Sequence, residues 1–198
     1  PAIVAAAAVK FVSPEPAGLL RLLVVGGSQG ARVMADIVPG AIERLEPALW
    51  SRLILTQQVR EEDMARVRAV YDRLKINAEL APFFADLPAR LASSHLVVSR
   101  SGAGTVAELG AIGRPSILVP LPGSIDQDQF ANAGVLAQAN GALRIPQVDF
   151  TPDRLAAEIS AVAAQPARLS AMAAAARTVG RLDAAERLAD LVAKVAGI

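Results

Sequence analysis

Leu22-Leu23-Val24-Val25-Gly26-Gly27-Ser28-Gln29-Gly30-Ala31-Arg32 is the stretch of the sequence that decides its fold. The first four residues form a short apolar run, which predicts a buried strand. A glycine-rich turn follows, and from Ala31 the apolar residues recur at helical spacing. A strand, a glycine-rich turn and a helix in this order are typical of the first unit of an α/β fold.

The same alternation of apolar runs and amphipathic stretches continues along the chain. The predicted strands are Leu22–Val25, Leu53–Thr56, Ala78–Ala81, Leu96–Ser99, Ser116–Val119 and Ala142–Ile145. The predicted helices are Ala31–Leu45, Glu61–Leu74, Leu87–Ala92, Gly104–Ile112, Gln127–Ala139 and three more after Thr151. Strands that are apolar throughout belong in a parallel sheet covered on both faces. The sequence therefore predicts a doubly wound, Rossmann-like α/β domain.

The composition of the chain excludes several classes of protein and of partner. The 198 residues are 53% hydrophobic and 20% charged, which predicts one soluble globular domain. The net charge of +1 provides no field to hold a nucleic-acid backbone, so we expect no nucleic-acid partner. The chain has no cysteine, which excludes disulfides and thiolate nucleophiles. The apolar run within Pro1–Phe11 lacks a basic leader and is too short to span a bilayer, so we expect neither a signal peptide nor an anchor.

The glycine-rich turn is one of three loops that follow predicted strands at the ligand-binding edge of such a sheet. Its glycines permit close backbone approach, and the helix start behind them favours a phosphate group. The spacing is not that of a dinucleotide fingerprint, and the lysine of a P-loop is absent. The alternative is a tight turn in which Ser28 is the N-cap of the helix. This loop alone leaves the two interpretations equal.

The second loop runs from Ser99 to Glu108. A glutamate one turn into the following helix can accept hydrogen bonds from both hydroxyls of a ribose. Thr105 and Glu108 also have the spacing of a capping box, in which Glu108 folds back onto its own backbone. Spacing alone slightly favours the capping box.

The third loop, 120–132, is rich in hydrogen-bonding side chains. The amides of Gln129 and Asn132 suit neutral sugar hydroxyls, which need paired donors and acceptors. Asp126 and Asp128 resemble a divalent-metal motif, but both are predicted in the first turn of a helix, where acids stabilise the helix dipole. We therefore expect no metal there.

Two other conspicuous residues have structural interpretations. His95 is the single histidine, and it stands at the head of a predicted strand, away from the ligand edge. We expect a structural role for it, and we expect Trp50 to pack at a helix end.

Taken in order, the three loops resemble the C-terminal half of the MurG family, the UDP-N-acetylglucosamine:lipid I N-acetylglucosaminyltransferases of peptidoglycan synthesis. The resemblance runs from about Leu22 to the final helix. It implies the C-terminal half of a GT-B fold and an inverting transfer of N-acetylglucosamine that needs no metal or other cofactor. The acceptor implied is an undecaprenyl-pyrophosphate-linked sugar, reached by peripheral contact with the cytoplasmic face of the bacterial inner membrane.

The resemblance also implies roles for individual residues. Ser28 corresponds to a diphosphate contact, Glu108 to the ribose acceptor, and Phe84 to the residue whose backbone pairs with uracil. This assignment reverses the preference for a capping box at Glu108. The full set implied to bind UDP-N-acetylglucosamine is Gly27, Ser28, Gln29, Phe84, Ser101, Gly102, Ala103, Gly104, Thr105, Val106, Glu108, Asp128, Gln129 and Asn132.

Two departures from the family pattern limit what the resemblance implies. Residues 122–124 read Pro-Gly-Ser where family members often carry a histidine. The family's N-terminal acceptor domain and its proposed base are missing from these 198 residues, so we expect no catalytic residue in this half, and donor binding without efficient transfer. We divide the chain into a linker remnant and domain start (1–20), a UDP-sugar-binding domain (21–165) and C-terminal helices (166–198) that pack on it or cross to the missing domain. The alternatives are a standalone donor-binding subunit with a membrane partner and an enzyme like the UDP-N-acetylglucosamine 2-epimerases.

Overall fold

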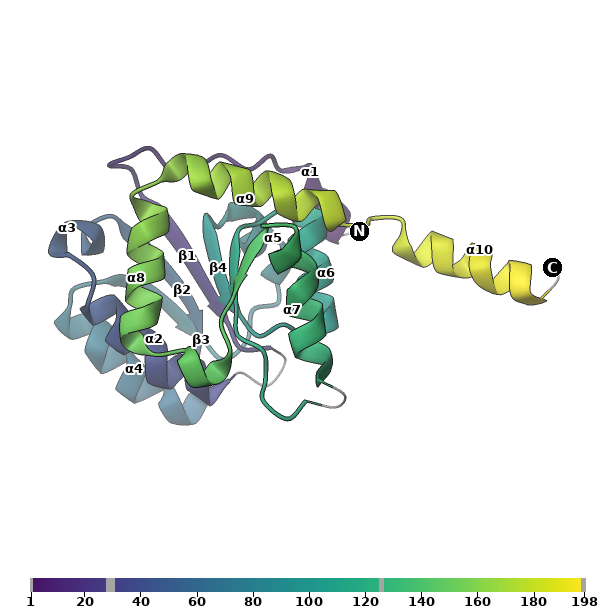
Figure 1. Cartoon of the computed structure of the whole chain (residues 1–198). Coiled ribbons are helices and arrows are strands. Elements are labelled where there is room, and N and C mark those ends of the chain that lie inside the picture. The colour runs from purple at the N-terminus through teal and green to yellow at the C-terminus, as the bar shows by residue number, and fades with distance from the viewer. Residues whose placement is uncertain (1, 28–30, 125–126, 197–198) are drawn as a thin grey trace.

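The computed structural model describes residues 2–27, 31–124 and 127–196. Six parallel strands form one sheet in the order β3-β2-β1-β4-β5-β6 (Figure 1). Their bounds are β1 (Leu20–Val25), β2 (Leu53–Gln58), β3 (Asn77–Ala81), β4 (Leu96–Ser99), β5 (Ser116–Leu118) and β6 (Ala142–Arg144). This order is that of the doubly wound dinucleotide-binding fold. The predicted fold class is confirmed.

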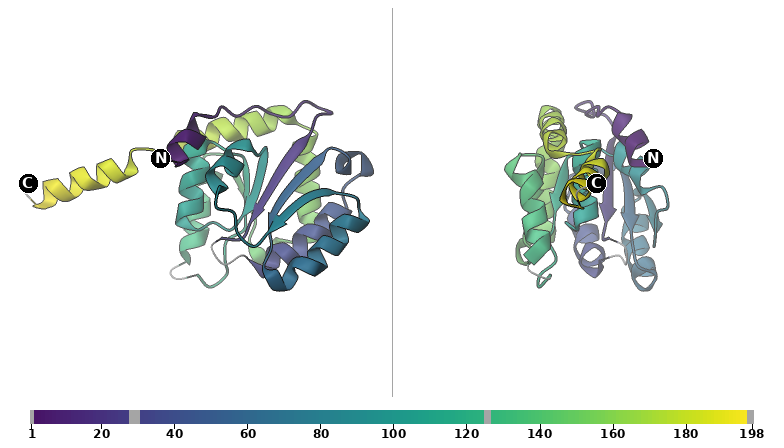
Figure 2. Two further views of the ribbon diagram at one scale, coloured as in Figure 1. Left: turned by 180° about the vertical axis from the view of Figure 1, so that it is seen from behind. Right: turned by 90° about the vertical axis from the view of Figure 1, so that its right-hand side faces the viewer.

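Helices cover both faces of the sheet, which makes three layers (Figure 2). The helices of the described residues are α1 (Ala2–Ala8), α2 (Arg32–Glu43), α3 (Pro47–Trp50), α4 (Glu61–Arg73), α5 (Leu87–Ser93), α6 (Ala103–Ile112), α7 (Asp128–Gln138), α8 (Pro152–Ala163), α9 (Pro166–Val179) and α10 (Ala184–Ala196), with a short 3₁₀ turn η2 (Gln147–Asp149). All but α10 lie against the body of the domain.

Strand β1 shows why these strands are apolar throughout. Leu22 and Val24 pack into the core beneath α2, α4 and α8, whereas Leu23 and Val25 pack into the core beneath α1, α5, α6 and α7. Successive side chains of a strand point to opposite faces, so a strand between two helical layers needs apolar residues at every position.

All six predicted strands and all predicted helices are present. Each strand begins and ends within two residues of its predicted bounds. The sequence did not reveal α1 and α3. Helix α1 is nearly all alanine and has no polar face, so it lacks a helical period; Ala6 and Ala7 pack it against α5 and α6. Helix α3 has only four residues, too few for a periodic signal.

The chain after β6 is helical, as predicted. Helix α8 packs on α2, and α9 packs on α6, α7 and α8. Helix α10 extends away from the body of the domain, and none of its described side chains is buried (Figure 1). Among the described residues, no helix is both long and apolar enough to cross a membrane.

Candidate functional site

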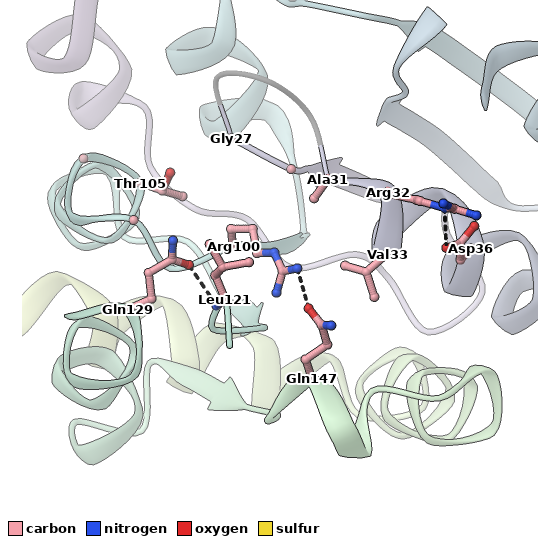
Figure 3. A pocket seen from close by; sticks show the side chains of 13 residues that line it. Gly27, Ala31, Arg32, Val33, Asp36, Arg100, Thr105, Leu121, Gln129 and Gln147 are labelled. Atoms are coloured by element: carbon pink, nitrogen blue, oxygen red, sulfur yellow. Dashed lines mark hydrogen bonds and ion pairs between the residues drawn. The ribbon is translucent and has the colours of Figure 1, made fainter. Parts of the chain in front are cut away.

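The candidate site lies where the order of the sheet reverses, between β1 and β4. The two strands are hydrogen-bonded neighbours, with Val25 beside Ser99, so the segments that follow them diverge from one point. A cavity of about 740 Å³ opens there (Figure 3). Its lining consists of Gly26, Gly27, Ala31, Arg32, Val33, Asp36, Arg100, Gly102, Gly104, Thr105, Leu121, Gln129 and Gln147.

A second cavity of about 230 Å³ adjoins the first. Gly27, Gly104 and Thr105 line both cavities, so the two form one continuous site. The remaining lining residues of the smaller cavity are Val25, Gln58, Phe83, Phe84, Leu87 and Glu108. This part of the site is largely apolar and holds a single carboxylate.

Glycine at two of these positions is not explained by the protein's own packing. A β-carbon added to Gly102 or Gly104 would meet no atom within 4 Å, whereas one added to Gly141 would lie 2.6 Å from Ala176 Cα. Gly102 also has an ordinary φ of −59°. The open space in front of these two glycines is the cavity, so their missing side chains leave the start of α6 accessible to a ligand.

The glycine-rich turn after β1 is only partly described. Gly27 has a φ of +96°, which favours glycine, and it lines both cavities. Ser28 and Gln29 lie outside the described residues. Among the described residues, Ala31 occupies the N-cap position of α2, and its side chain makes no capping bond. The alternative interpretation, with Ser28 as an N-cap, falls on a residue outside the described part of the chain.

Helix α6 excludes the capping box that spacing alone suggested. The helix begins at Ala103, its N-cap is Gly102, and no side chain bonds to that cap. Thr105 is thus the third residue of the helix, and Glu108 lies a further turn inside it. Glu108 lines the smaller cavity, and its partial burial raises the pKa of its carboxyl group.

Arg100 places a buried positive charge beside the larger cavity. Its Nη1 donates to the carbonyl oxygens of Val119 (3.1 Å) and Pro120 (3.0 Å), and its Nη2 donates to Gln147 Oε1 (Figure 3). Burial lowers the pKa of the guanidinium group. None of these partners is an acid, so among the described residues neutral acceptors hold the cation.

The third loop contributes Gln129 to the larger cavity. Its Oε1 accepts from the Leu121 N–H (3.1 Å), and its carbonyl oxygen accepts from Ser101 Oγ (2.7 Å). Asp128 is the first residue of α7, and its Oδ1 accepts from the Gln129 N–H (2.7 Å), as expected for an acid at a helix start. Asp126 lies outside the described residues. No group of three or more potential metal-ligating side chains gathers in the part of the chain that the structure describes.

The structure brings together some of the predicted site residues and not others. Those that line a cavity are Gly27, Phe84, Gly102, Gly104, Thr105, Glu108 and Gln129. Those that lie near but line neither cavity are Ser101, Ala103, Val106, Asp128 and Asn132. Val106 belongs to the hydrophobic core, because it lies on the face of α6 that packs on the sheet. The sequence did not single out Gln58 or Gln147, because their positions beside the loops depend on strand order.

Two structural predictions are confirmed. His95 lies at the opposite edge of the sheet, is 8% exposed, and its Nδ1 accepts from the Arg21 N–H (3.1 Å). Trp50 ends α3, packs against the core and donates from Nε1 to the carbonyl oxygen of Ile42 (2.7 Å).

A doubly wound parallel sheet with an open, glycine-lined cavity at its reversal point is typical of nucleotide-binding domains. The sequence model of the glycosyltransferase family 28 C-terminal domain matches residues 21–188. The chain belongs to this glycosyltransferase family.

Individual relatives agree with this assignment. The chain is 83% identical over 198 residues to the UDP-N-acetylglucosamine--N-acetylmuramyl-(pentapeptide) pyrophosphoryl-undecaprenol N-acetylglucosamine transferase of Bradyrhizobium diazoefficiens, covering 54% of that protein. It is 82% identical over 196 residues (99% of this chain) to the protein of the same name from Nitrobacter hamburgensis, covering 53% of it. The crystal structure of MurG from Acinetobacter baumannii superposes with a TM-score of 0.80 at 30% identity, covering 89% of this chain and 52% of that one.

The resemblance to the MurG family is therefore confirmed, and the family domain that matches is a C-terminal one. The chain spans about half the length of the curated relatives it matches.

Proposed function

We propose that this chain binds UDP-N-acetylglucosamine and is the donor half of a transferase that delivers N-acetylglucosamine to an undecaprenyl-pyrophosphate-linked sugar. The names of the relatives support the reaction. The pair of adjoining cavities is the observation that supports the donor site. The two cavities differ in chemistry in the same way as the nucleoside end and the diphosphate-sugar end of a nucleotide sugar.

The smaller cavity suits the uridine. Its apolar walls, which include Phe83 and Phe84, suit the flat face of a base. Glu108 is the one carboxylate in its lining, and it can accept hydrogen bonds from both ribose hydroxyls. The energetic cost of partly burying this carboxylate is offset when the hydroxyl groups become its partners.

The larger cavity suits the diphosphate and the sugar. Gly102 and Gly104 open the start of α6 to an anion, and Arg100 adds a positive charge that neutral acceptors hold among the described residues. Gln129 is the amide placed to meet a sugar hydroxyl. These groups also stabilise the UDP that leaves in a transfer reaction.

Transfer requires more than donor binding. Asp36 and Glu108 are the acids among the described residues that line the cavities, and no histidine lines either one. Deprotonation of an acceptor hydroxyl requires a base placed within reach, which we assign to a domain outside this chain. The shortage of acids and histidines also disfavours the epimerase alternative. We further propose that the complete enzyme works without metal at the cytoplasmic face of the inner membrane.

A thermal-shift titration tests the donor site. UDP and UDP-N-acetylglucosamine should stabilise the chain, by about 2.7 kcal/mol at roughly 100 times the dissociation constant. ADP-glucose and NAD at equal concentration should give much smaller shifts, and EDTA should leave the UDP shift unchanged. Equal shifts with all nucleotides, or none with UDP, would refute the proposal.

A further inference from the structure

Strand β2 ends in two consecutive buried glutamines, Gln57 and Gln58, which are 0% and 6% exposed. Because successive side chains of a strand point to opposite faces, the two amides enter different layers. The Gln57 Oε1 accepts from the Tyr71 hydroxyl of α4, and its Nε2 donates to the carbonyl oxygen of Met34 in α2 (3.4 Å). Gln57 is thus tied to the helical layer and lines neither cavity.

Gln58 is tied to the site. The Gly26 N–H donates to Gln58 Oε1 (3.0 Å), and Gln58 Nε2 donates to the carbonyl oxygen of Pro82 (3.0 Å). Gly26 opens the glycine-rich turn after β1, and Pro82 precedes Phe83 and Phe84 after β3. One side-chain amide therefore joins the two loops that lie on either side of β2.

The bridge lies between two parts of the site with different chemistry. Gly27, next to Gly26, lines both cavities, whereas Phe84 lines only the smaller one. In the proposed function the larger cavity, which Gly26 and Gly27 line, holds the diphosphate, and the smaller cavity, which Phe84 lines, holds the base. These groups are covalently joined in a nucleotide, so the loops must keep a separation that matches the ligand.

We propose that Gln58 is a positioning residue that holds Gly26 and Gly27, after β1, and the Phe83–Phe84 loop at the separation required by a uridine nucleotide. This inference rests on the proposed function. The amide is suited to the task because it accepts at one end and donates at the other. Glutamate in its place loses the donor to Pro82, and methionine loses both bonds while keeping a similar length.

The test compares Gln58→Met with Gln57→Met in the 198-residue chain. Each variant removes the hydrogen bonds of one buried amide, so both should lower the thermal midpoint. Loss of a buried hydrogen-bonding partner changes an equilibrium constant roughly tenfold. We expect Gln58→Met to raise the dissociation constant for UDP about tenfold or more and Gln57→Met to change it less than about twofold.

Ligand fragments provide the readout that general destabilisation would not change. Uridine occupies one part of the site and inorganic pyrophosphate the other, so neither depends on the separation of the two loops. We expect Gln58→Met to weaken each fragment less than about threefold, well below the loss for UDP. A loss for uridine or pyrophosphate as large as that for UDP would overturn the inference.

The remaining outcomes are also decisive. Equal loss of UDP affinity in the two methionine variants, or none in Gln58→Met, overturns the positioning role. Failure of the wild-type chain to bind UDP refutes the proposed function instead. If Gln58→Met does not fold, Gln58→Glu, which keeps the acceptor for Gly26, replaces it: selective loss of UDP affinity supports the inference, and unchanged affinity overturns it.

Discussion

Gly180 packs its backbone directly on that of Gly110, at the point where α9 ends against α6. A β-carbon on Gly180 would overlap the carbonyl group of Gly110, whereas one on Gly110 would lie 3.2 Å from Gly180 Cα. The contact brings the chain leaving α9 against the helix whose first turn lines the site. It is a close approach that only glycine allows on the α9 side.

We therefore expect Gly180→Ala to lower the free energy of unfolding by about 1–3 kcal/mol, because extra volume in a packed contact forces the backbone apart. Gly110→Ala should cost less, since its neighbour must yield only slightly. Urea denaturation of both variants measures the difference. A larger loss in Gly110→Ala than in Gly180→Ala would contradict this account.

Gly102→Ala should separate binding from folding. Its β-carbon meets no protein atom within 4 Å, so the fold should lose only about 0.5–1 kcal/mol, the difference between glycine and alanine at an N-cap. The new methyl group would project into the larger cavity and obstruct the diphosphate. We expect the dissociation constant for UDP, measured by isothermal titration calorimetry, to rise about tenfold or more. Unchanged affinity would show that the ligand does not approach this residue.

Glu108→Gln should raise the free energy of unfolding of the ligand-free protein and lower its affinity for UDP. Burial raises the pKa of Glu108 above its ordinary 4.5, so the stability that the protonated group provides is complete below 4.5 and is lost as pH rises through the folded-state pKa. The variant should therefore gain stability over the wild type at pH 7 and lose that advantage near pH 4. UDP binding at pH 7 should weaken by about 1.5–3 kcal/mol, as for hydrogen bonds to a charged group. Thermal melts across pH and a UDP titration check both effects, and a gain in UDP affinity would contradict the ribose assignment.

Arg100→Met should act on the phosphate end of the ligand. It removes the buried cation of the larger cavity, whereas uridine alone belongs in the smaller cavity, which Arg100 does not line. We expect UDP affinity to fall about tenfold or more and uridine affinity to stay within about twofold. Because the carbonyls of Val119 and Pro120 lose their donor, stability should also fall, so the titration is made well below the thermal midpoint. Equal losses for UDP and uridine would show that Arg100 acts only through the fold.

The sequence predicted those features that depend on local pattern. The apolar runs of β1 and β4 indicate buried parallel strands because both faces are covered, and the glycines after them mark the ligand edge. The position of Glu108 one turn into α6 could also be read directly. The hydrogen-bonding partner of Glu108 could not be read from the sequence, because Thr105 and Glu108 have the spacing of a capping box. Only the observed start of the helix excludes that interpretation.

Features that depend on contacts between distant segments were not predictable. Gln58 joins Gly26 to Pro82, residues 56 positions apart, only because β2 lies between β1 and β3 in the sheet. Gln147 likewise reaches Arg100 from the 3₁₀ turn after β6. Neither glutamine belongs to a local motif, so spacing and composition carry no signal for it.

His95 should make the stability of the protein depend on pH near neutrality. Burial lowers the pKa of His95 below its ordinary 6.5, helped by the nearby charges of Arg21 and Arg114. Its Nδ1 accepts the Arg21 N–H, so protonation there would break that bond. A lowered folded-state pKa means that the contribution of His95 is complete above 6.5 and is lost as pH falls below it. His95 is the single histidine in the sequence, so His95→Gln should flatten the change in thermal midpoint between about pH 5 and 7.5. A slope that persists in His95→Gln would show that another group is responsible.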